Sequence, residues 1–482
     1  MRRSVVKGST GITHKAMPAL VAKMHDLLSE HVFVPSMRLR RLIKPGQRPA
    51  IRAYYAGMRF RRETADWSEE RKRQWILERL RFVVRRAARE TLYYSELFKR
   101  TGFDPDVDFS FDDFARLPIL EREEMRQAGR ELVSCVVPAN LLRKDATGGS
   151  TGVPTEVWKG PEEIGWGESA IDYFMERIEV PVGARTAYFW GHNLDPVARD
   201  SWRARLYDFQ MNVRWFDCFR LSPEVLNRYH HEFESWRPAC IIAYASALGS
   251  LAEHVIDCGY HPNYPAKCFV TGAEKLMPKH REMIERAFSC PVHERYGGRD
   301  VGMIGFQLEP ASTLDYTIDW ANVLIEPETS DAVSSILVTK LHADGMPMIR
   351  YRVGDLGRFP EGSRPGYPTF ALREVLGREM DRIWLPEGRW VHSVELPHLM
   401  KDHPVREWML FQRADYSVEV RIVTANGFGQ RNRDEILSTL RSNLPGVRVT
   451  LEEVNEIPRT QANKLRPVVS EIERVKAGSL QK

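Results

Sequence analysis

The feature that most constrains the fold is a regular alternation of strand-like and helical segments over residues 132–360. Short apolar runs such as residues 186–190 and 239–244 are typical of buried strands, and amphipathic stretches such as residues 246–258 follow them. Because parallel strands need long crossover connections, this order predicts an α/β architecture with largely parallel strands. Further strands are expected at residues 268–271, 291–296 and 336–340. One or two helices are expected at residues 70–100, and further helices at residues 121–129, 162–178 and 278–288.

The length of 482 residues exceeds what one hydrophobic core usually serves, so we expect several domains. The composition shifts in a Pro/Gly-rich segment at residues 359–368 and again at Gly377 and Arg378. An α+β pattern follows, with strands at residues 417–423 and 447–453 around a helix at residues 433–444. The predicted division is a basic arm (residues 1–62), a large α/β domain (63–377) and a small mobile α+β domain (378–482).

Composition narrows the class of protein. A hydrophobic content of 43% with 28% charged residues is ordinary for a soluble globular chain, and a net charge of +5 is too small to argue nucleic-acid binding. The six cysteines are dispersed, which indicates reduced thiols in the cytoplasm. Cys290 and His293 have a metal-like spacing, but no second pair accompanies them, so a buried thiol is the preferred interpretation.

Positive charge is concentrated in residues 1–62, which carry 14 Lys and Arg but only Asp26 and Glu30, a surplus of 12. The apolar stretches of this arm are too short to span a bilayer, and no signal-peptide pattern is recognisable. Two interpretations stay open. The arm either packs on its own domain, or it contacts an anionic membrane surface or an acidic partner.

A loop rich in glycine and hydroxyl side chains lies between Asp145 and Thr155. Glycine amides can direct several donors into one concavity, and hydroxyl groups add donors suited to phosphate oxygens. The loop lacks the lysine of a Walker motif, so a nucleotide would be held in another way, and a plain polar turn is the alternative. The candidate phosphate ligands are Thr147, Gly148, Gly149, Ser150, Thr151, Gly152 and Thr155.

Further motifs follow this loop in a fixed order, at residues 270–274, 295–302, 347–355, 376–383 and 457–466. Together with the loop they resemble the adenylate-forming superfamily of acyl-CoA synthetases, firefly luciferases and peptide-synthetase adenylation domains. Residues 90–98 and 117–120 are similar to the N-terminal signature of its phenylacetate-CoA ligase and CapK branch. The resemblance covers about residues 62–470.

The resemblance implies an enzyme that uses ATP and Mg²⁺ to join a carboxylic acid to AMP and then passes the acyl group to CoA. The alternatives are an amine or hydroxyl acceptor in polysaccharide or natural-product assembly, AMP transfer itself, or a nucleotide-binding protein without catalysis. The expected partner is a small carboxylic acid, with no nucleic acid, and a homodimer is left open. The expected location is the cytoplasm, with peripheral membrane contact as an alternative.

The resemblance also assigns residues to the nucleotide. The loop at residues 147–155 would close over the β- and γ-phosphates. Gly272, Ala273 and Glu274 would line the adenine slot, and Tyr296 would stack on the base, with Gly297 beside it. A core position for Tyr296 is the alternative.

Four charged residues complete the expected site. Asp355 would bind the ribose hydroxyls with the help of Arg378, and Asp300 would engage Mg²⁺. Lys464 would bridge the α-phosphate and the substrate carboxylate, and Lys464 and Arg378 are the expected catalytic residues. Capping roles for the two aspartates and an ordinary surface position for Lys464 are the alternatives.

The chain departs from the family pattern at several positions. Arg299 replaces the usual threonine, and Asp300 is one methylene shorter than the usual glutamate. Met380 lies where the interdomain hinge usually has an aspartate, and Asn463 replaces the glycine before Lys464. These departures put the metal geometry and the hinge rotation in question.

The acyl pocket is expected to include Trp190, His192, Tyr244 and Ser246. The aromatic residues favour an aryl or flat acid, although core positions for them are the alternative. His192 could contact the carboxylate or serve as a structural histidine.

Overall fold

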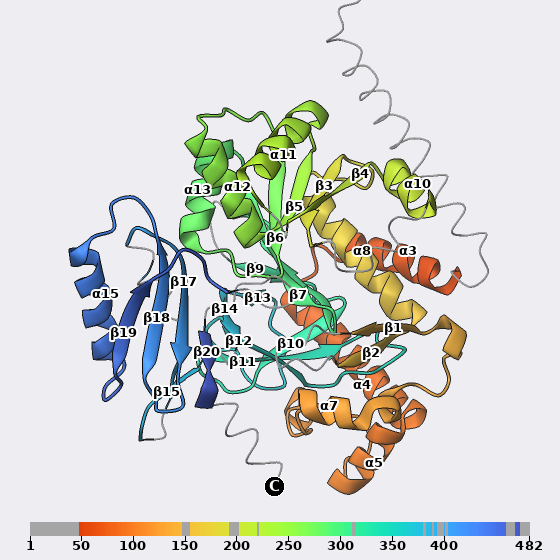
Figure 1. The fold of residues 1–482 in the computed structure, drawn as a ribbon. Helices are drawn as coiled ribbons and strands as arrows, with labels where there is room; N and C mark the ends of the chain where they lie inside the picture. Colours follow the sequence, from red (N-terminus) through yellow and green to blue (C-terminus); the bar gives the residue numbers. More distant parts are fainter. Residues whose placement is uncertain are drawn as a thin grey trace, which may run out of the picture.

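The computed structural model describes residues 48–146, 155–191, 202–218, 221–310, 315–378, 382–387, 390–392, 400, 403–458 and 468–472. Its largest sheet has the strand order β13-β9-β8-β7-β6-β5-β3-β4 (Figure 1). The bounds are β3 (Thr186–Trp190), β4 (Val213–Asp217), β5 (Cys240–Tyr244), β6 (Cys268–Gly272), β7 (Val292–Gly298), β8 (Gly302–Phe306), β9 (Tyr316–Ile318) and β13 (Ala371–Leu372). The five strands from β3 to β7 pair in parallel, which confirms the predicted α/β fold.

Helices cover both faces of this sheet. Ile241 and Ala243 of β5 lie in one hydrophobic cluster with Phe233 and Leu248, whereas Cys240 and Ile242 lie in another with residues of α8. Side chains of a strand alternate between its faces, so this division shows that β5 is buried on both sides. The covering helices are α8 (Pro161–Arg177), α11 (Pro223–Trp236), α12 (Ala245–Asp257) and α13 (Pro278–Phe288), and α10 (Trp202–Met211) leads into β4.

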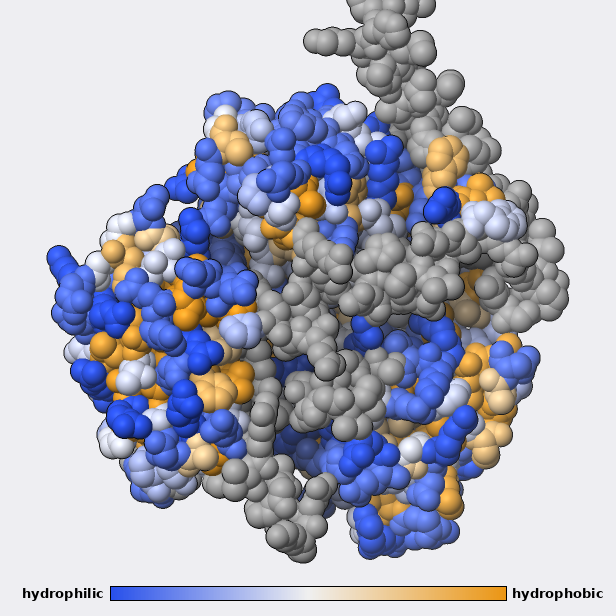
Figure 2. Space-filling view, in the orientation of Figure 1, coloured by the Kyte–Doolittle hydropathy of each residue, from blue (hydrophilic) through white to orange (hydrophobic). Residues whose placement is uncertain are grey.

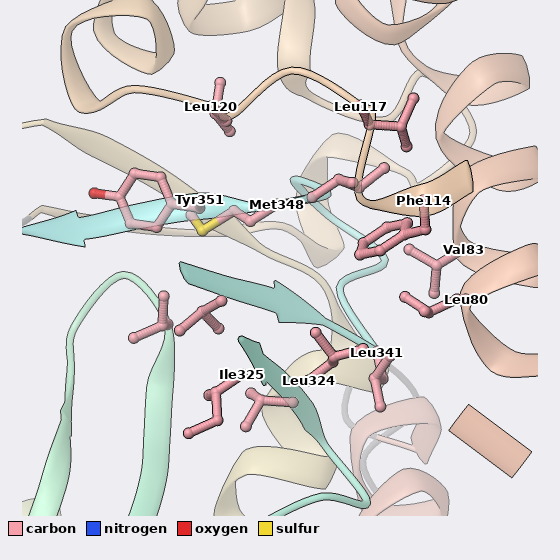
Figure 3. Close-up of a cluster of buried hydrophobic side chains, with 14 of the residues drawn as sticks. Leu80, Val83, Phe114, Leu117, Leu120, Leu324, Ile325, Leu341, Met348 and Tyr351 are labelled. Carbon is pink, nitrogen blue, oxygen red and sulfur yellow. The ribbon is translucent and has the colours of Figure 1, made fainter. Parts of the chain in front are cut away.

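A second sheet packs against the N-terminal helices (Figure 3). Its antiparallel strands are β10 (Val323–Pro327), β11 (Val333–Lys340), β12 (Tyr351–Arg358) and β14 (Glu374–Arg378). Leu80, Phe114 and Leu120 pack against Leu324 and Tyr351 in its core. The helices are α4 (Glu69–Glu90), α5 (Leu92–Thr101), α6 (Phe111–Phe114) and α7 (Arg122–Ala128), and 3₁₀ turns follow at Gly129–Leu132 and Ala139–Leu141.

Helix α3 (Arg48–Glu63) packs along α8, so residues 48–62 of the predicted arm belong to the folded core. The approach is close, because a side chain at Gly165 would place its Cβ 2.2 Å from the carbonyl oxygen of Ala50. The guanidinium of Arg61 is buried and forms an ion pair of 2.7 Å with Asp319. It also donates to the Ser169 hydroxyl at 2.8 Å.

The C-terminal part has its own sheet, in the order β19-β18-β17-β20, and its own hydrophobic cluster. Lys279 of α13 donates to the carbonyl oxygen of Val405 at 2.8 Å, and Arg406 pairs with Glu253 of α12 at 2.8 Å. The boundary predicted at residues 377 and 378 stays a prediction. The elements are β15 (Arg382–Trp384), β16 (Trp390–His392), β17 (Val405–Gln412), β18 (Val418–Thr424), α15 (Gln430–Asn443), β19 (Val449–Glu453) and β20 (Val468–Ser470).

Among the coloured residues in Figure 2, hydrophilic ones predominate, and hydrophobic ones lie in several separate groups. Among the described helices, none is both long enough and apolar enough to cross a membrane.

The buried pair of Arg61 and Asp319 generates a stability prediction. Arg61→Met leaves the Asp319 carboxylate buried without its cation, so we expect the free energy of unfolding to fall by about 3–5 kcal/mol. Arg62→Met is the matched control, because Arg62 is exposed and pairs with Glu176 near solvent; we expect at most about 1 kcal/mol. Denaturant unfolding followed by circular dichroism measures both changes. Equal losses in the two variants would contradict this role for the buried pair.

Candidate functional site

The candidate site lies at the carboxyl edge of the parallel strands. Trp190 ends β3, Tyr244 ends β5 and Gly272 ends β6, while Tyr296 lies in the last part of β7. Because these strands run in parallel, their ends meet at one edge of the sheet, which is where open α/β sheets bind ligands. The structure therefore brings residues of the predicted acyl pocket and of two predicted motifs to one edge.

The glycine-rich loop connects two strands of a hairpin. Strands β1 (Arg143–Ala146) and β2 (Glu156–Lys159) pair antiparallel, with Ala146 opposite Glu156. Lys159 and Asp145 form an ion pair of 2.9 Å across the hairpin, and Thr155 is buried. The other predicted phosphate ligands, residues 147–152, lie outside the described residues.

The base of this hairpin is fixed against the second sheet. The Asp344 carboxylate accepts hydrogen bonds from the backbone amides of Glu162 (2.9 Å) and Glu163 (3.1 Å) in the first turn of α8. Gly160 permits this contact, because a Cβ there would lie 2.3 Å from an Asp344 oxygen. A carboxylate at a helix N-terminus satisfies free amides and the helix dipole, so Asp344 anchors both α8 and the end of β2.

The predicted adenine motif forms the turn after β6. Ala273 has a left-handed backbone with φ of 67°, which is uncommon for a residue with a side chain. Glu274 accepts a hydrogen bond of 3.1 Å from the backbone amide of Ser246, in the first turn of α12. The turn thus brings together Glu274 and Ser246, which the sequence assigned to the adenine slot and the acyl pocket.

Tyr296, Asp355 and Arg378 form a connected group. The Tyr296 hydroxyl donates to Asp355 Oδ2 at 2.8 Å, and Arg378 Nε lies 3.1 Å from Asp355 Oδ1. Asp355 and Arg378 are also register partners in β12 and β14. Burial raises the pKa of Asp355, an effect that Arg378 and the Tyr296 hydroxyl partly offset. Three residues predicted from separate motifs are therefore neighbours.

Asp300, the predicted magnesium ligand, is engaged by protein groups. Its Oδ2 accepts hydrogen bonds from Arg122 (3.2 Å) and the Tyr351 hydroxyl (3.0 Å), and its Oδ1 accepts one from the Val301 amide (3.1 Å). A cation at this carboxylate would have to displace or repel the Arg122 guanidinium. In this arrangement Asp300 does not fit as a metal ligand, and that role stays a prediction.

A buried ion pair supports the turn that carries Asp300. Lys340 pairs with Glu163 of α8, and its ammonium also donates to the backbone oxygen of Asp300 at 3.0 Å. Burial lowers the pKa of Lys340 and raises that of Glu163, while their mutual attraction opposes both shifts. The pair ties α8, β11 and this turn together.

The predicted acyl pocket is partly described. The rings of Trp190 and Tyr244 meet edge to face at 4.3 Å, and burial raises the pKa of Tyr244 to about 12. The Arg295 guanidinium lies 5.2 Å from the centre of the Trp190 ring. The sequence motifs assign no role to Arg295, and the signal that could have found it is the adjacent charged pair Glu294 and Arg295 inside the predicted strand at residues 291–296. His192 lies outside the described residues.

Other predicted residues fall in undescribed segments. Lys464, Asn463 and Met380 lie outside the described residues, so their roles stay predictions. The predicted thiol Cys290 is buried, and the nearby His293 instead contacts the carbonyl oxygen of Gln307 at 2.8 Å. The buried-thiol interpretation of Cys290 is confirmed.

One histidine group among the described residues could hold a metal ion. Ligand atoms of His230, His231 and Glu234 on α11 lie within 4.8 Å of one another. This group shares no residue with the predicted site.

Comparisons with known proteins find distant relatives along most of the chain. It is 21% identical to Protein CapK of Staphylococcus aureus over 393 residues, which cover 79% of this chain and 85% of CapK. It is 22% identical to a phenylacetate-coenzyme A ligase of Thermus thermophilus over 455 residues, 86% of this chain and 99% of the relative. It is 24% identical to the ligase of that name from Pseudomonas putida over 323 residues, 64% of this chain and 71% of the relative. No protein-family model matches the chain.

Solved structures of CoA ligases are similar in fold to this chain over most of its length. A 2-hydroxyisobutyryl-CoA ligase in its postadenylation state, in complex with R3-HIB-AMP, matches with a TM-score of 0.65 and 20% identity, over 86% of this chain and 92% of that chain. The same ligase in its thioesterification state, with 2-HIB-AMP and CoA, matches with a TM-score of 0.53, over 86% and 93%. These findings confirm the resemblance that the sequence motifs indicated.

The hydroxyl of Tyr296 generates a second stability prediction. Tyr296→Phe removes a donor from the partly buried Asp355 carboxylate, so we expect the free energy of unfolding to fall by about 1–3 kcal/mol. Tyr367→Phe is the matched control, because the Tyr367 hydroxyl donates to Asp112 at 3.1 Å on the surface, where water can replace it. Urea titration of both variants measures the difference. A Tyr296→Phe loss no larger than that of the control would rule out a structural role for this hydrogen bond.

Proposed function

We propose that this protein, a member of the adenylate-forming superfamily in its phenylacetate-CoA ligase and CapK-like branch, activates a carboxylic acid with ATP and transfers the acyl group to CoA. The observation that carries the proposal is the group of Tyr296, Asp355 and Arg378 at the carboxyl edge of the parallel sheet. It combines an aromatic ring, a carboxylate and a guanidinium, which suit a base, ribose hydroxyls and negative charge, respectively.

In the first step, a carboxylate oxygen of the acid attacks the α-phosphorus of ATP. The bond from the α-phosphorus to the bridging oxygen breaks, and pyrophosphate leaves, so that an acyl-AMP forms. The protein's task is to hold the carboxylate in line with that bond and to stabilise the developing negative charge. ATP is used as its magnesium complex, in which the ion supplies part of the charge neutralisation.

Residues of this chain would divide that task. The hairpin loop at residues 147–155 would hold the β- and γ-phosphates, and Lys464 would bridge the α-phosphate and the carboxylate. The Tyr296 ring would contact the base, in the slot formed by Gly272, Ala273 and Glu274. Asp355 keeps lone pairs free for ribose hydroxyls even while it accepts from Tyr296, because each carboxylate oxygen can accept two hydrogen bonds.

In the second step, the thiol of CoA loses its proton to solvent and its sulfur attacks the acyl carbon; AMP leaves with the bonding electron pair, and a thioester forms. A second candidate keeps adenylation but replaces the thiol with an amine or hydroxyl acceptor, or ends in AMP transfer. The departures at Met380 and Asn463 favour testing it, because Met380 lies at the expected hinge of the C-terminal part and Asn463 directly precedes Lys464.

The adenylation proposal predicts pyrophosphate exchange with ATP that depends on a carboxylic acid. Lys464→Ala removes the charge expected at the reacting phosphate, so we expect exchange with the best acid to fall by about 10²–10³-fold. Lys476→Ala, a nearby lysine without an assigned role, should exchange like the wild type. Exchange by Lys464→Ala at the wild-type rate would show that the catalytic assignment is wrong.

The purified wild-type protein also tests the identity of the acyl acceptor and the alternative of a nucleotide-binding protein without catalysis. Mass spectrometry of reactions with CoA, amines and hydroxyl compounds should detect the acyl-CoA. Acyl-AMP that never yields acyl-CoA would reject CoA as acceptor, and an absence of exchange with every acid would favour a nucleotide-binding protein without catalysis.

We also propose that the basic arm attaches this otherwise cytoplasmic protein to an anionic membrane surface. Residues 1–47 carry nine Lys and Arg against only Asp26 and Glu30, which supports this proposal. So does the outward face of α3, where the exposed Arg52, Arg59 and Arg62 line a cavity with the exposed Tyr55. A homodimer stays a prediction.

The membrane proposal predicts co-flotation with vesicles. We expect the full chain to float with vesicles that contain phosphatidylserine at low salt and to detach at high salt, because exposed charges are screened. A chain that lacks residues 1–47 keeps α3 and should float less. Flotation that is equal for both chains, or equal on neutral vesicles, would dismiss this role for the arm.

A further inference from the structure

Arg295 lies beside the group that would bind the nucleotide but faces the other way. It directly precedes Tyr296 on β7, and consecutive side chains of a strand point to opposite faces of the sheet. Its side chain passes over Gly272, where an added Cβ would lie 3.1 Å from both Cγ and Nε of Arg295. The guanidinium lies 5.2 Å from the centre of the Trp190 ring. Arg295 therefore connects the end of β6 with the predicted acyl pocket.

The charge of Arg295 has no counterion in the described part of the chain. In those residues its guanidinium lies over the Trp190 ring, and Tyr188 and Cys240 are polar neighbours that act on its charge. The buried arginines Arg61 and Arg350, in contrast, pair with Asp319 and Glu326. Burial lowers the pKa of Arg295, although the guanidinium keeps its proton at neutral pH. Arg295 is half-buried, and a partly desolvated cation without an anion is costly, so an incoming anion removes that cost.

The surroundings of this cation suit an organic anion. The half-buried Trp190 ring offers a flat apolar surface and packs at 4.3 Å on the buried Tyr244 ring, while Gly272 contributes no side chain. Ligand sites commonly combine such apolar surfaces with a few polar groups that fix orientation. A guanidinium is the side chain that best matches a carboxylate, because two of its N–H groups can donate to the two oxygens.

We propose that Arg295 binds a second anionic group of the acid substrate, so that the protein prefers dicarboxylic acids to monocarboxylic acids. This inference rests on the proposed function. One carboxylate would react at the α-phosphate, where Lys464 is expected, and the other would pair with Arg295. A monocarboxylic acid would instead leave the guanidinium partly desolvated and unpaired. A site discriminates strongly against a substrate that leaves one of its own polar groups without a partner.

The test compares matched acids in the pyrophosphate-exchange assay. The pairs are succinate with butyrate and terephthalate with 4-methylbenzoate, in which a carboxylate replaces a methyl group. We expect kcat/KM of the wild type to favour the diacid of at least one pair by about tenfold or more, the value typical of a hydrogen bond to a charged group. Arg295→Met should abolish this preference through a higher KM for the diacid, and Arg295→Lys should keep part of it.

Arg214→Met is the matched control, because Arg214 also lies over a tryptophan, Trp236, at 4.6 Å, but on the edge strand β4 and outside the predicted site. It should leave the preference unchanged. Thermal unfolding of each variant separates a loss of fold from a change of specificity, and Arg295→Lys serves if Arg295→Met does not fold.

The outcomes separate this inference from the function on which it rests. Exchange with monocarboxylic acids at rates equal to those of the diacids, or a preference unchanged in Arg295→Met and Arg295→Lys, overturns the inference and leaves adenylation standing. An absence of exchange with every acid overturns both.

Discussion

The parallel hydrogen bonding of β3, β5, β6 and β7 is the constraint on which the rest of the structure depends. It is possible because both faces of the sheet are covered by helices, so the strands can be apolar on each side. It brings the strand ends to one edge, where Trp190, Tyr244 and Gly272 lie near one another. Residues widely separated in the sequence thereby line one region, which local structure alone could not achieve.

Buried charges then hold the neighbouring elements at this edge. Lys340 and Glu163 connect β11 with α8, and Lys340 also reaches the backbone of Asp300. Asp344 binds two amides at the start of α8. Each ion costs desolvation energy, which its partners must offset, so these contacts tolerate little displacement. The same requirement explains why the Asp300 carboxylate, supplied with donors by Arg122 and Tyr351, is poorly suited to a metal ion in this arrangement.

The site is asymmetric in its charges. On one side, Asp355 accepts a hydrogen bond from Tyr296 and pairs with Arg378. The proposed nucleotide would bind to this group, whose charges are already paired. On the other side, Arg295 lies over an aromatic ring, and the described residues give it no anion. Because these residues come from adjacent positions of β7, the alternation of one strand separates the proposed nucleotide and acid functions.

The sequence by itself determined the class of fold and much of the group that is proposed to bind the nucleotide. The spacing of apolar residues predicted strands and helices, including α13 at the observed bounds. This is possible because the local order of apolar and polar residues reflects which faces of an element are buried. The resemblance of the motifs predicted Tyr296, Asp355 and Arg378 as site residues, although no motif predicts that they contact one another. Only the tertiary structure decided which charges are paired: it gave Arg61 and Asp300 their partners and showed none for Arg295 among the described residues. The physical reason is that pairing depends on distances between residues far apart in the sequence, and no local pattern encodes them.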